Sequence, residues 1–167
     1  MDFFELVEKR YSVRAYKPDQ VEREKLERVL EAARLAPTAA NRQPFRIIVV
    51  ATEGRKEELR RVYSREWFIQ APYIIALCAV PAEAWVRRDG RNYGVVDATI
   101  VMDHLILAAA ALGLGTCWIA AFDEPAAREV LGIPPAWDPV ALTPLGFPAD
   151  EWKPKKRRPL DELVIIK

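Results

Sequence analysis

Two arginines four positions apart, with a hydroxyl between them, are the first residues with types and spacing suited to chemistry. They lie in the segment Arg10–Arg14, RYSVR, directly after a short N-terminal stretch of helical character. A guanidinium group can hold a phosphate through two parallel hydrogen bonds, and Ser12 adds a short donor. The segment therefore indicates an anion site. The alternative is a solvated turn that carries two surface arginines.

A second polar group lies in the loop from Pro37 to Pro44, APTAANRQP, and consists of Thr38, Asn41 and Gln43. Side-chain amides can match the donor and acceptor edge of a planar heterocycle, and the alanines between them allow close approach. The loop is thus a candidate for binding a flat ring. A polar turn between a helix and a strand is the alternative.

The run GLGTCWIAAFD ends an expected strand on two small residues, Ala120 and Ala121. Ligands of open α/β folds sit beyond strand ends, and small side chains leave backbone N–H groups free to contact a ring. Gly113 and Gly115 follow a helix and precede a strand, which is the reverse of the order in a dinucleotide fingerprint. This run therefore predicts a ligand contact through the backbone, and no dinucleotide or P-loop motif.

The tail, Glu151–Lys167, contains five positive charges in the six residues KPKKRR. A nucleic-acid or targeting patch, a solvated surface and a clamp reaching back to the Arg10–Arg14 segment are the three interpretations. The whole chain has 25 Lys and Arg against 24 Asp and Glu, a net charge of +1. Because such a chain has no general attraction for nucleic acid or anionic membrane, we expect neither as a partner.

The residues that most often bind metals are few and scattered. Cys78 and Cys117 each sit in an apolar run, and with the one histidine, His104, they make no plausible zinc site. We expect no metal, and two buried free thiols as in a reducing cytoplasm. His104 lies seven residues after Asp97 on an expected helix, so both can share a face. A core histidine bonded to a neighbour is favoured over a proton donor to substrate.

The chain shows no segment typical of export or membrane insertion. Its N-terminus, MDFFELVEKRYS, has acids where a signal peptide has basic residues and then an apolar core. The longest apolar stretch, Thr99 to Leu114, is interrupted by Asp103 and His104 and is too short and polar to span a bilayer. A soluble, cytoplasmic protein is the expectation.

Helices and strands alternate in the expected elements that position these residues, and 167 residues suit a single domain, 1–167. Such alternation implies an α/β layer structure. The helix over 95–112 is apolar nearly all round and is expected to be central and buried. The segment from Ala82 to Tyr93 is irregular and could form a lid. Helical patterns cover 2–9, 20–37, 53–67, 95–112 and 124–131, and strand patterns cover 44–52, 73–80, 116–122, 140–146 and 162–167.

Two features indicate a second subunit. The strand-like end of the tail, ELVIIK, follows a long polar segment and has no neighbouring strand in the sequence. The loop from Pro37 to Pro44 has more functional side chains than a simple connection needs.

Together, these segments resemble the nitroreductase family of FMN-dependent oxidoreductases over essentially the whole chain. The resemblance rests on RYSVR, APTAANRQP, DATIVMDHLILAAAALGLG, TCWIAAFD and RRPLDELV, in this order. It implies an α/β (α+β) fold with a central mixed sheet flanked by helices. It also implies an intertwined homodimer with exchanged C-terminal strands and two FMN molecules in the interface.

The resemblance also implies which residues bind FMN. Larger family members often carry a Glu-Gly pair where this chain has two alanines, so only a backbone role near flavin N5 carries over. One chain would contribute Arg10, Tyr11, Ser12 and Arg14, with Lys155 and Arg157 at the phosphate. The other would contribute Pro37, Thr38, Ala39, Asn41 and Gln43, and the ring would be lined by Trp118, Ile119, Ala120 and Ala121.

The implied reaction passes electrons from NADH or NADPH through FMN to a small oxidised acceptor, such as a nitroaromatic or a quinone, in ping-pong order. Arg14, near the N1–O2 side of the flavin, would stabilise the anionic reduced form. Alternatives are another FMN reaction (reductive dehalogenation, oxidation or flavin breakdown) and a non-enzymatic flavin-binding module. Dehalogenating relatives use acidic, tyrosine and lysine lid contacts, a set that WVRRDGRNYG lacks.

Overall fold

The computed structural model describes residues 2–167. Met1, the first residue of the domain predicted over 1–167, lies outside the described residues. Short 3₁₀ turns cover Ala39–Asn41, Glu66–Ile69 and Leu160–Glu162. The helices are α1 (Phe3–Lys9), α2 (Arg23–Arg34), α3 (Lys56–Val62), α4 (Gly94–Ala111) and α5 (Glu124–Leu131). The strands are β1 (Phe45–Ala51), β2 (Tyr73–Ala79), β3 (Gly115–Thr116) and β4 (Asp138–Gly146).

The four strands form one sheet in the order β1-β2-β4-β3, and every neighbouring pair is antiparallel. A single parallel bridge joins Ser12 to Thr116 at the β3 edge. Within residues 2–167, this bridge is thus the one parallel contact of the sheet that was predicted to be mixed. The bridge fixes the Arg10–Arg14 segment to the edge of the sheet.

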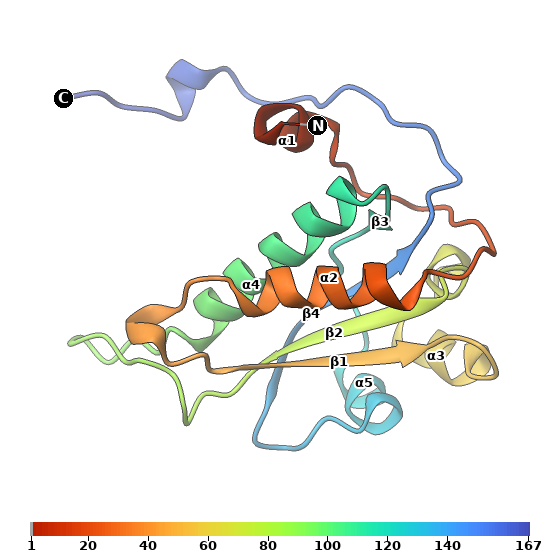
Figure 1. Cartoon of the computed structure of the whole chain (residues 1–167). Helices are drawn as coiled ribbons and strands as arrows, with labels where there is room; N and C mark the ends of the chain where they lie inside the picture. Colours follow the sequence, from red (N-terminus) through yellow and green to blue (C-terminus); the bar gives the residue numbers. More distant parts are fainter. Residues whose placement is uncertain (1) are drawn as a thin grey trace.

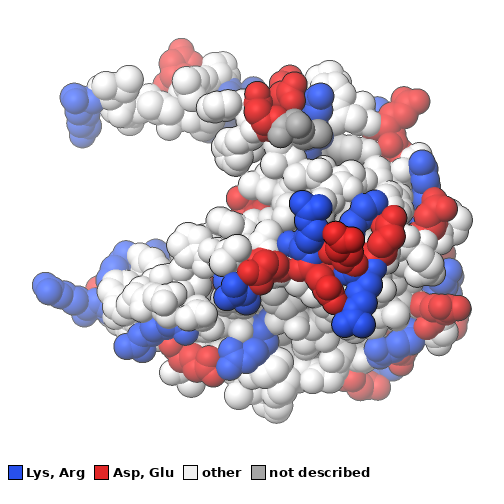
Figure 2. Space-filling model, viewed as in Figure 1, with Lys and Arg blue, Asp and Glu red and all other residues white. Residues whose placement is uncertain are grey.

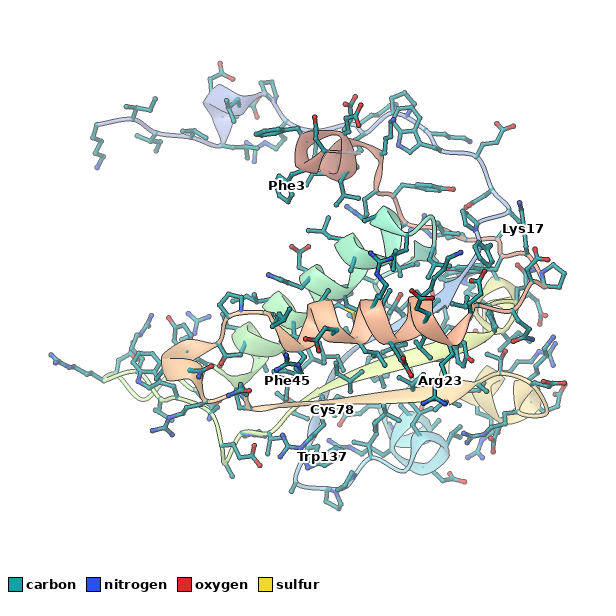
Figure 3. The ribbon with its side chains drawn as sticks, in the orientation of Figure 1. Phe3, Lys17, Arg23, Phe45, Cys78 and Trp137 are labelled. Atoms are coloured by element: carbon teal, nitrogen blue, oxygen red, sulfur yellow. The ribbon has the colours of Figure 1, made fainter. Side chains whose placement is uncertain are left out.

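Helices cover both faces of the sheet, which confirms the predicted layer structure. Helices α2 and α4 pack on one face, and α3 and α5 pack on the other (Figure 1). Along β2, Ile75 and Leu77 join the core under α4, whereas Ile74 and Cys78 join the core over α5. Since successive strand residues point to opposite faces, covering both faces requires an uninterrupted apolar strand. Cys78 lies within the sheet in Figure 3.

Two predicted elements are shorter in the structure. The strand over 116–122 reduces to β3 and one bridge between Ile119 and Leu142, because the Thr143 hydroxyl accepts the Cys117 N–H at 3.0 Å. The Cys117 N–H is therefore not available for a regular hydrogen-bond ladder with a neighbouring strand. The helix over 53–67 ends at Val62, and Tyr63 is extended with its ring edge-on to Phe68, at 5.5 Å between centroids.

Helix α4 is buried on one side and open on the other. It is the only helix within residues 2–167 that is long and apolar enough to cross a membrane, yet it packs between α2 and the sheet. Met102 and Leu105 are fully buried, whereas Val95 is 47% exposed. The prediction of a central buried helix is thus confirmed for the face that meets the sheet.

The two ends of the chain form an arm beside the open side of α4. Helix α1 buries none of its residues, and Phe3 projects from it on the side of a hollow (Figures 2 and 3). The tail passes α1 and leads away from the body (Figure 1). Residues 162–167 form no strand with their own chain, and Ile165 is 83% exposed. Their pairing with a second chain stays a prediction.

Candidate functional site

The Arg10–Arg14 segment is held by the end of α1 and by β3. Arg10 ends α1, and its N–H donates to Leu6 O at 2.8 Å. Val13 N donates to Thr116 O at 2.9 Å, and the Val13 side chain is buried against Gly115. A Cβ at Gly115 would lie 2.7 Å from Val13 Cγ2, so the close approach requires glycine at this position. The two arginines therefore flank a fixed point of the sheet edge.

Asp150, which precedes the tail, organises the far end of this segment. Its carboxylate accepts Arg14 N–H at 2.8 Å, and its carbonyl accepts the Tyr11 hydroxyl at 2.9 Å. Burial and the hydrogen bond to Asp150 raise the pKa of Tyr11 to about 12. A cleft of about 550 Å³ is lined by Tyr11, Ser12, Arg14, Asp150, Glu151 and Lys153. Asp150 is a residue that sequence reasoning missed, because nothing local marks it as a partner of a segment 136 positions earlier.

Two cations of the tail, Lys155 and Arg157, lie near Arg10. Lys155 Nζ donates to Val7 O on α1. Burial, together with Arg10 and Arg157, lowers the pKa of Lys155 below its usual range. The tail thus returns to the end of α1 and places Lys155 near Arg10 and Arg157, and we call these three residues the basic cluster. Their binding of a phosphate stays a prediction. Three cations held close together favour binding of a polyvalent anion.

The polar loop, residues 37–44, has an unusual backbone. Ala40, Asn41 and Gln43 have φ of 52°, 53° and 53°. Left-handed conformations cost about 1–2 kcal/mol each for residues other than glycine. Two hydrogen bonds oppose that cost: Gln43 N donates to Thr38 Oγ1 at 3.0 Å, and Ala39 N donates to Asp97 Oδ1 at 2.8 Å. The loop is thus held in one strained shape, as is common at functional sites.

The third predicted contact, Trp118 to Ala121, leaves the sheet at an irregular edge. Ile119 exchanges two hydrogen bonds of 2.9 Å with Leu142. Ala120 and Ala121 are exposed, and within residues 2–167 their N–H groups donate to no protein acceptor. Such free backbone donors can contact a flat ring, although Ile119 is itself buried in the core.

One chain does not bring these groups together. Arg10 shares a pocket with Ala110 and Gly113 at the C-terminal end of α4, whereas the polar loop binds Asp97 near its N-terminal end. Helix α4 continues for 14 residues from Asp97 to its last residue, Ala111, or about 21 Å. The basic cluster and the polar loop therefore lie at opposite ends of α4 (Figure 1). Contribution of the two from different chains stays a prediction.

The remaining candidate residues have structural contacts. His104 Nδ1 lies 3.0 Å from Ile100 O, so the histidine is bonded to a neighbour as expected, but it is half-buried and not in the core. Its predicted proximity to Asp97 leads to no contact. Cys78 and Cys117 are free and buried, as predicted, and burial raises the pKa of each thiol. Residues 2–167 hold no group of three His, Cys, Asp or Glu side chains suited to a metal.

The segment from Ala82 to Tyr93 is ordered by its own contacts. Val86 and Asn92 form a bridge, and the rings of Trp85 and Tyr93 meet edge-on at 5.2 Å between centroids. Arg42 Nη1 donates to Ala84 O at 3.3 Å. The segment thus supports the polar loop, and a lid function stays a prediction.

Comparison with known proteins gives consistent matches over nearly the whole chain. The model of the nitroreductase family matches residues 7–67 and 56–147. A Thermus thermophilus protein called NADH dehydrogenase is 31% identical over 188 aligned residues, which cover 94% of this chain and 92% of the relative.

Two solved structures from Clostridium difficile show the same fold. A nitroreductase family protein superposes with a TM-score of 0.86 and 36% identity, covering 99% of this chain and 98% of the other. An FMN-dependent nitroreductase superposes with a TM-score of 0.77 and 28% identity, covering 92% of each chain. The sheet edge, the basic cluster and the polar loop described above are therefore features of a chain that belongs to the nitroreductase family.

Proposed function

We propose that the protein is an FMN-dependent oxidoreductase that takes electrons from NADH or NADPH and passes them to a small oxidised acceptor. The observation that carries this proposal is the basic cluster: Lys155 Nζ of the tail donates to Val7 O on α1, three residues before Arg10, and the chain then reaches the sheet edge at Ser12. The cluster fits the single phosphate of FMN. The names of the relatives, an NADH dehydrogenase and an FMN-dependent nitroreductase, support the donor and the cofactor.

The residues of the candidate site fit FMN in two parts. Arg10, Ser12, Lys155 and Arg157 of one chain would hold the phosphate, and Thr38, Ala39, Asn41 and Gln43 of the other would hold the ring edge. The free N–H groups of Ala120 and Ala121 would lie against the ring. FMN supplies hydride transfer when bound, and the chain supplies position and charge. Arg14 would stabilise negative charge on the reduced ring.

A homodimer follows from the same proposal. The basic cluster and the polar loop lie at opposite ends of α4, so a complete site needs two copies. Exposed apolar residues lie on α1, with Phe4 79% exposed, and on the tail, with Ile166 93% exposed. An apolar surface of this kind is typical of an interface. We propose a single domain acting in the cytoplasm, a reducing compartment that suits the free thiols, and ping-pong turnover at one flavin face.

The test of this function is anaerobic reduction of the purified holoprotein. NADH or NADPH is expected to bleach the visible absorbance of bound flavin, and a nitroaromatic or quinone is expected to restore it. A panel of acceptors, compared by the rate of reoxidation, identifies the substrate class. Flavin that neither nicotinamide reduces would contradict the proposal.

We expect FMN, and not FAD, to be the bound cofactor. The basic cluster provides one phosphate site, and the sequence has no fingerprint for the second phosphate and the adenosine of a dinucleotide. Mass spectrometry of flavin released by heat or acid measures this directly. FAD as the main species would show that the cluster has been misinterpreted.

Flavin affinity is expected to fall as the pH rises through the lowered pKa of Lys155. The protonated amine binds phosphate, so FMN affinity is greatest below this pKa and is lost above it. Bound phosphate raises the pKa of Lys155. Between the pKa of the free protein and that of the complex, binding of FMN therefore takes up a proton. Tyr11, with a pKa of about 12, stays neutral over most of this range. Fluorescence titrations of FMN from neutral to alkaline pH measure the effect.

Two variants separate Lys155 from other lysines. Lys155→Gln is expected to bind FMN more weakly and with little dependence on alkaline pH. Lys17→Gln, at an exposed site outside the cluster, is expected to keep the wild-type profile. An unchanged profile in Lys155→Gln would assign the titration to another group.

A further inference from the structure

We infer that Asp97 is a positioning residue that holds the polar loop in its flavin-binding shape. Asp97 is 1% exposed and lies in the first turn of α4. Its Oδ1 accepts the Ala39 N–H at 2.8 Å, across 58 positions of sequence. The hydrogen bond comes directly before the left-handed residues Ala40 and Asn41. The carboxylate therefore fixes the point where the chain enters its strained conformation.

The position of Asp97 is itself fixed by close packing. A Cβ on Gly94, three residues before Asp97, would lie 3.2 Å from Ala84 Cβ. The first turn of α4 therefore packs closely against the segment from Ala82 to Tyr93. Arg42, which lies between the left-handed residues Asn41 and Gln43, donates to Ala84 O. The loop is thus held at two points, at Ala39 by Asp97 and at Arg42 by Ala84.

The second oxygen of Asp97 points to a functional role. Asp97 Oδ2 is the one buried side-chain nitrogen or oxygen within residues 2–167 that has no hydrogen-bond partner. An unpaired buried acceptor lowers the stability of a fold, and so do left-handed residues that are not glycine. The two occur together at one place, the loop that we propose for the flavin ring. The positive end of the α4 dipole favours a carboxylate at this position.

The inference rests on the proposed function for the identity of the ligand, but the hold on the loop can be measured without it. Hydrogen exchange of the loop amides in the apoprotein, read by mass spectrometry, reports whether Asp97 holds the loop. Fluorescence titration with FMN reports whether that shape matters for binding. The variants Asp97→Ala and Asp97→Asn are compared, because asparagine keeps an acceptor for Ala39 N–H and alanine removes it.

We expect Asp97→Ala to exchange faster over residues 38–43 and to bind FMN about tenfold to a hundredfold more weakly, as loss of a hydrogen bond to a charged group predicts. Asp97→Asn is expected to stay close to wild type in both measurements. Thr52→Ala is the matched control, since Thr52 is also buried and its hydroxyl donates to Ala71 O at 2.6 Å, away from the loop. It is expected to lower the melting temperature without changing loop exchange or FMN affinity.

The inference would be overturned by unchanged loop exchange in Asp97→Ala, by faster exchange with unchanged FMN affinity, or by an Asp97→Asn variant as defective as Asp97→Ala. Equal effects of Thr52→Ala on FMN affinity would assign the loss to general instability and would also contradict it. Failure of the proposed function looks different, because wild-type protein would then bind no FMN while the loop amides still responded to Asp97→Ala.

Discussion

A chain ending at Pro159 is expected to lose its dimer and most of its FMN affinity together. Within one chain, residues 160–167 bury little: Leu160 is 74% exposed and Ile166 is 93% exposed. Their removal from a monomer would therefore change its stability only slightly. If the partner chain covers them, each fully buried apolar side chain contributes about 1.5–3 kcal/mol to the dimer. The tail also carries Lys155 and Arg157, so loosening it weakens the hold on phosphate.

Sedimentation velocity and flavin fluorescence of the truncated protein measure the two losses. Leu35→Ser is a suitable control, because Leu35 is 64% exposed after α2 and lies outside the tail and α1. It is expected to leave both the dimer and the flavin intact. A stable, fully flavinated dimer without residues 160–167 would show that the tail is a free end.

Two inactive variants are expected to restore activity when their subunits mix. Arg14→Ala removes a cation that the proposed site places near developing negative charge, and loss of such an interaction costs about 3 kcal/mol in closed sites. Asn41→Ala removes an amide from the polar loop. A mixed dimer would have one site with both changes and one site with neither. Equal mixing gives half mixed dimers, and hence about a quarter of wild-type activity.

The measurement is turnover with a nicotinamide donor before and after subunit exchange. Each variant alone, taken through the same exchange, controls for recovery by refolding. If both residues acted from the same chain, each mixed dimer would have two damaged sites, and mixing would restore nothing.

Periodic elements were predictable from the sequence because their determinants are local. Helix α2 follows from apolar residues such as Val29 and Ala33 at helical spacing, and both are fully buried. The strand β2 follows from an apolar run that both faces of the sheet cover. The positive charges of the tail were evident from the sequence, but a position beside Arg10 was one of three interpretations of them.

Several departures from prediction depend on contacts between distant parts of the chain. The Thr143 hydroxyl interrupts the strand after β3 from 26 positions away. Helical spacing paired Asp97 with His104, but a backbone N–H from the polar loop lies closer to the carboxylate. The alternation of helices and strands was predicted correctly, but the antiparallel pairing of the strands depends on which edges meet in space. Local patterns do not specify such partners.

The separation of the basic cluster from the polar loop along α4 has a consequence for the cell. If the proposed site combines both groups, one copy of the chain cannot complete it, because a helix cannot bend so far that its ends meet. Mass action then links flavin occupancy to protein abundance: dilution favours colourless monomers, and added FMN favours assembly. With such a shared site, the supply of flavin would set how much of the protein is active, and a freshly made chain would stay inactive until it met a second one.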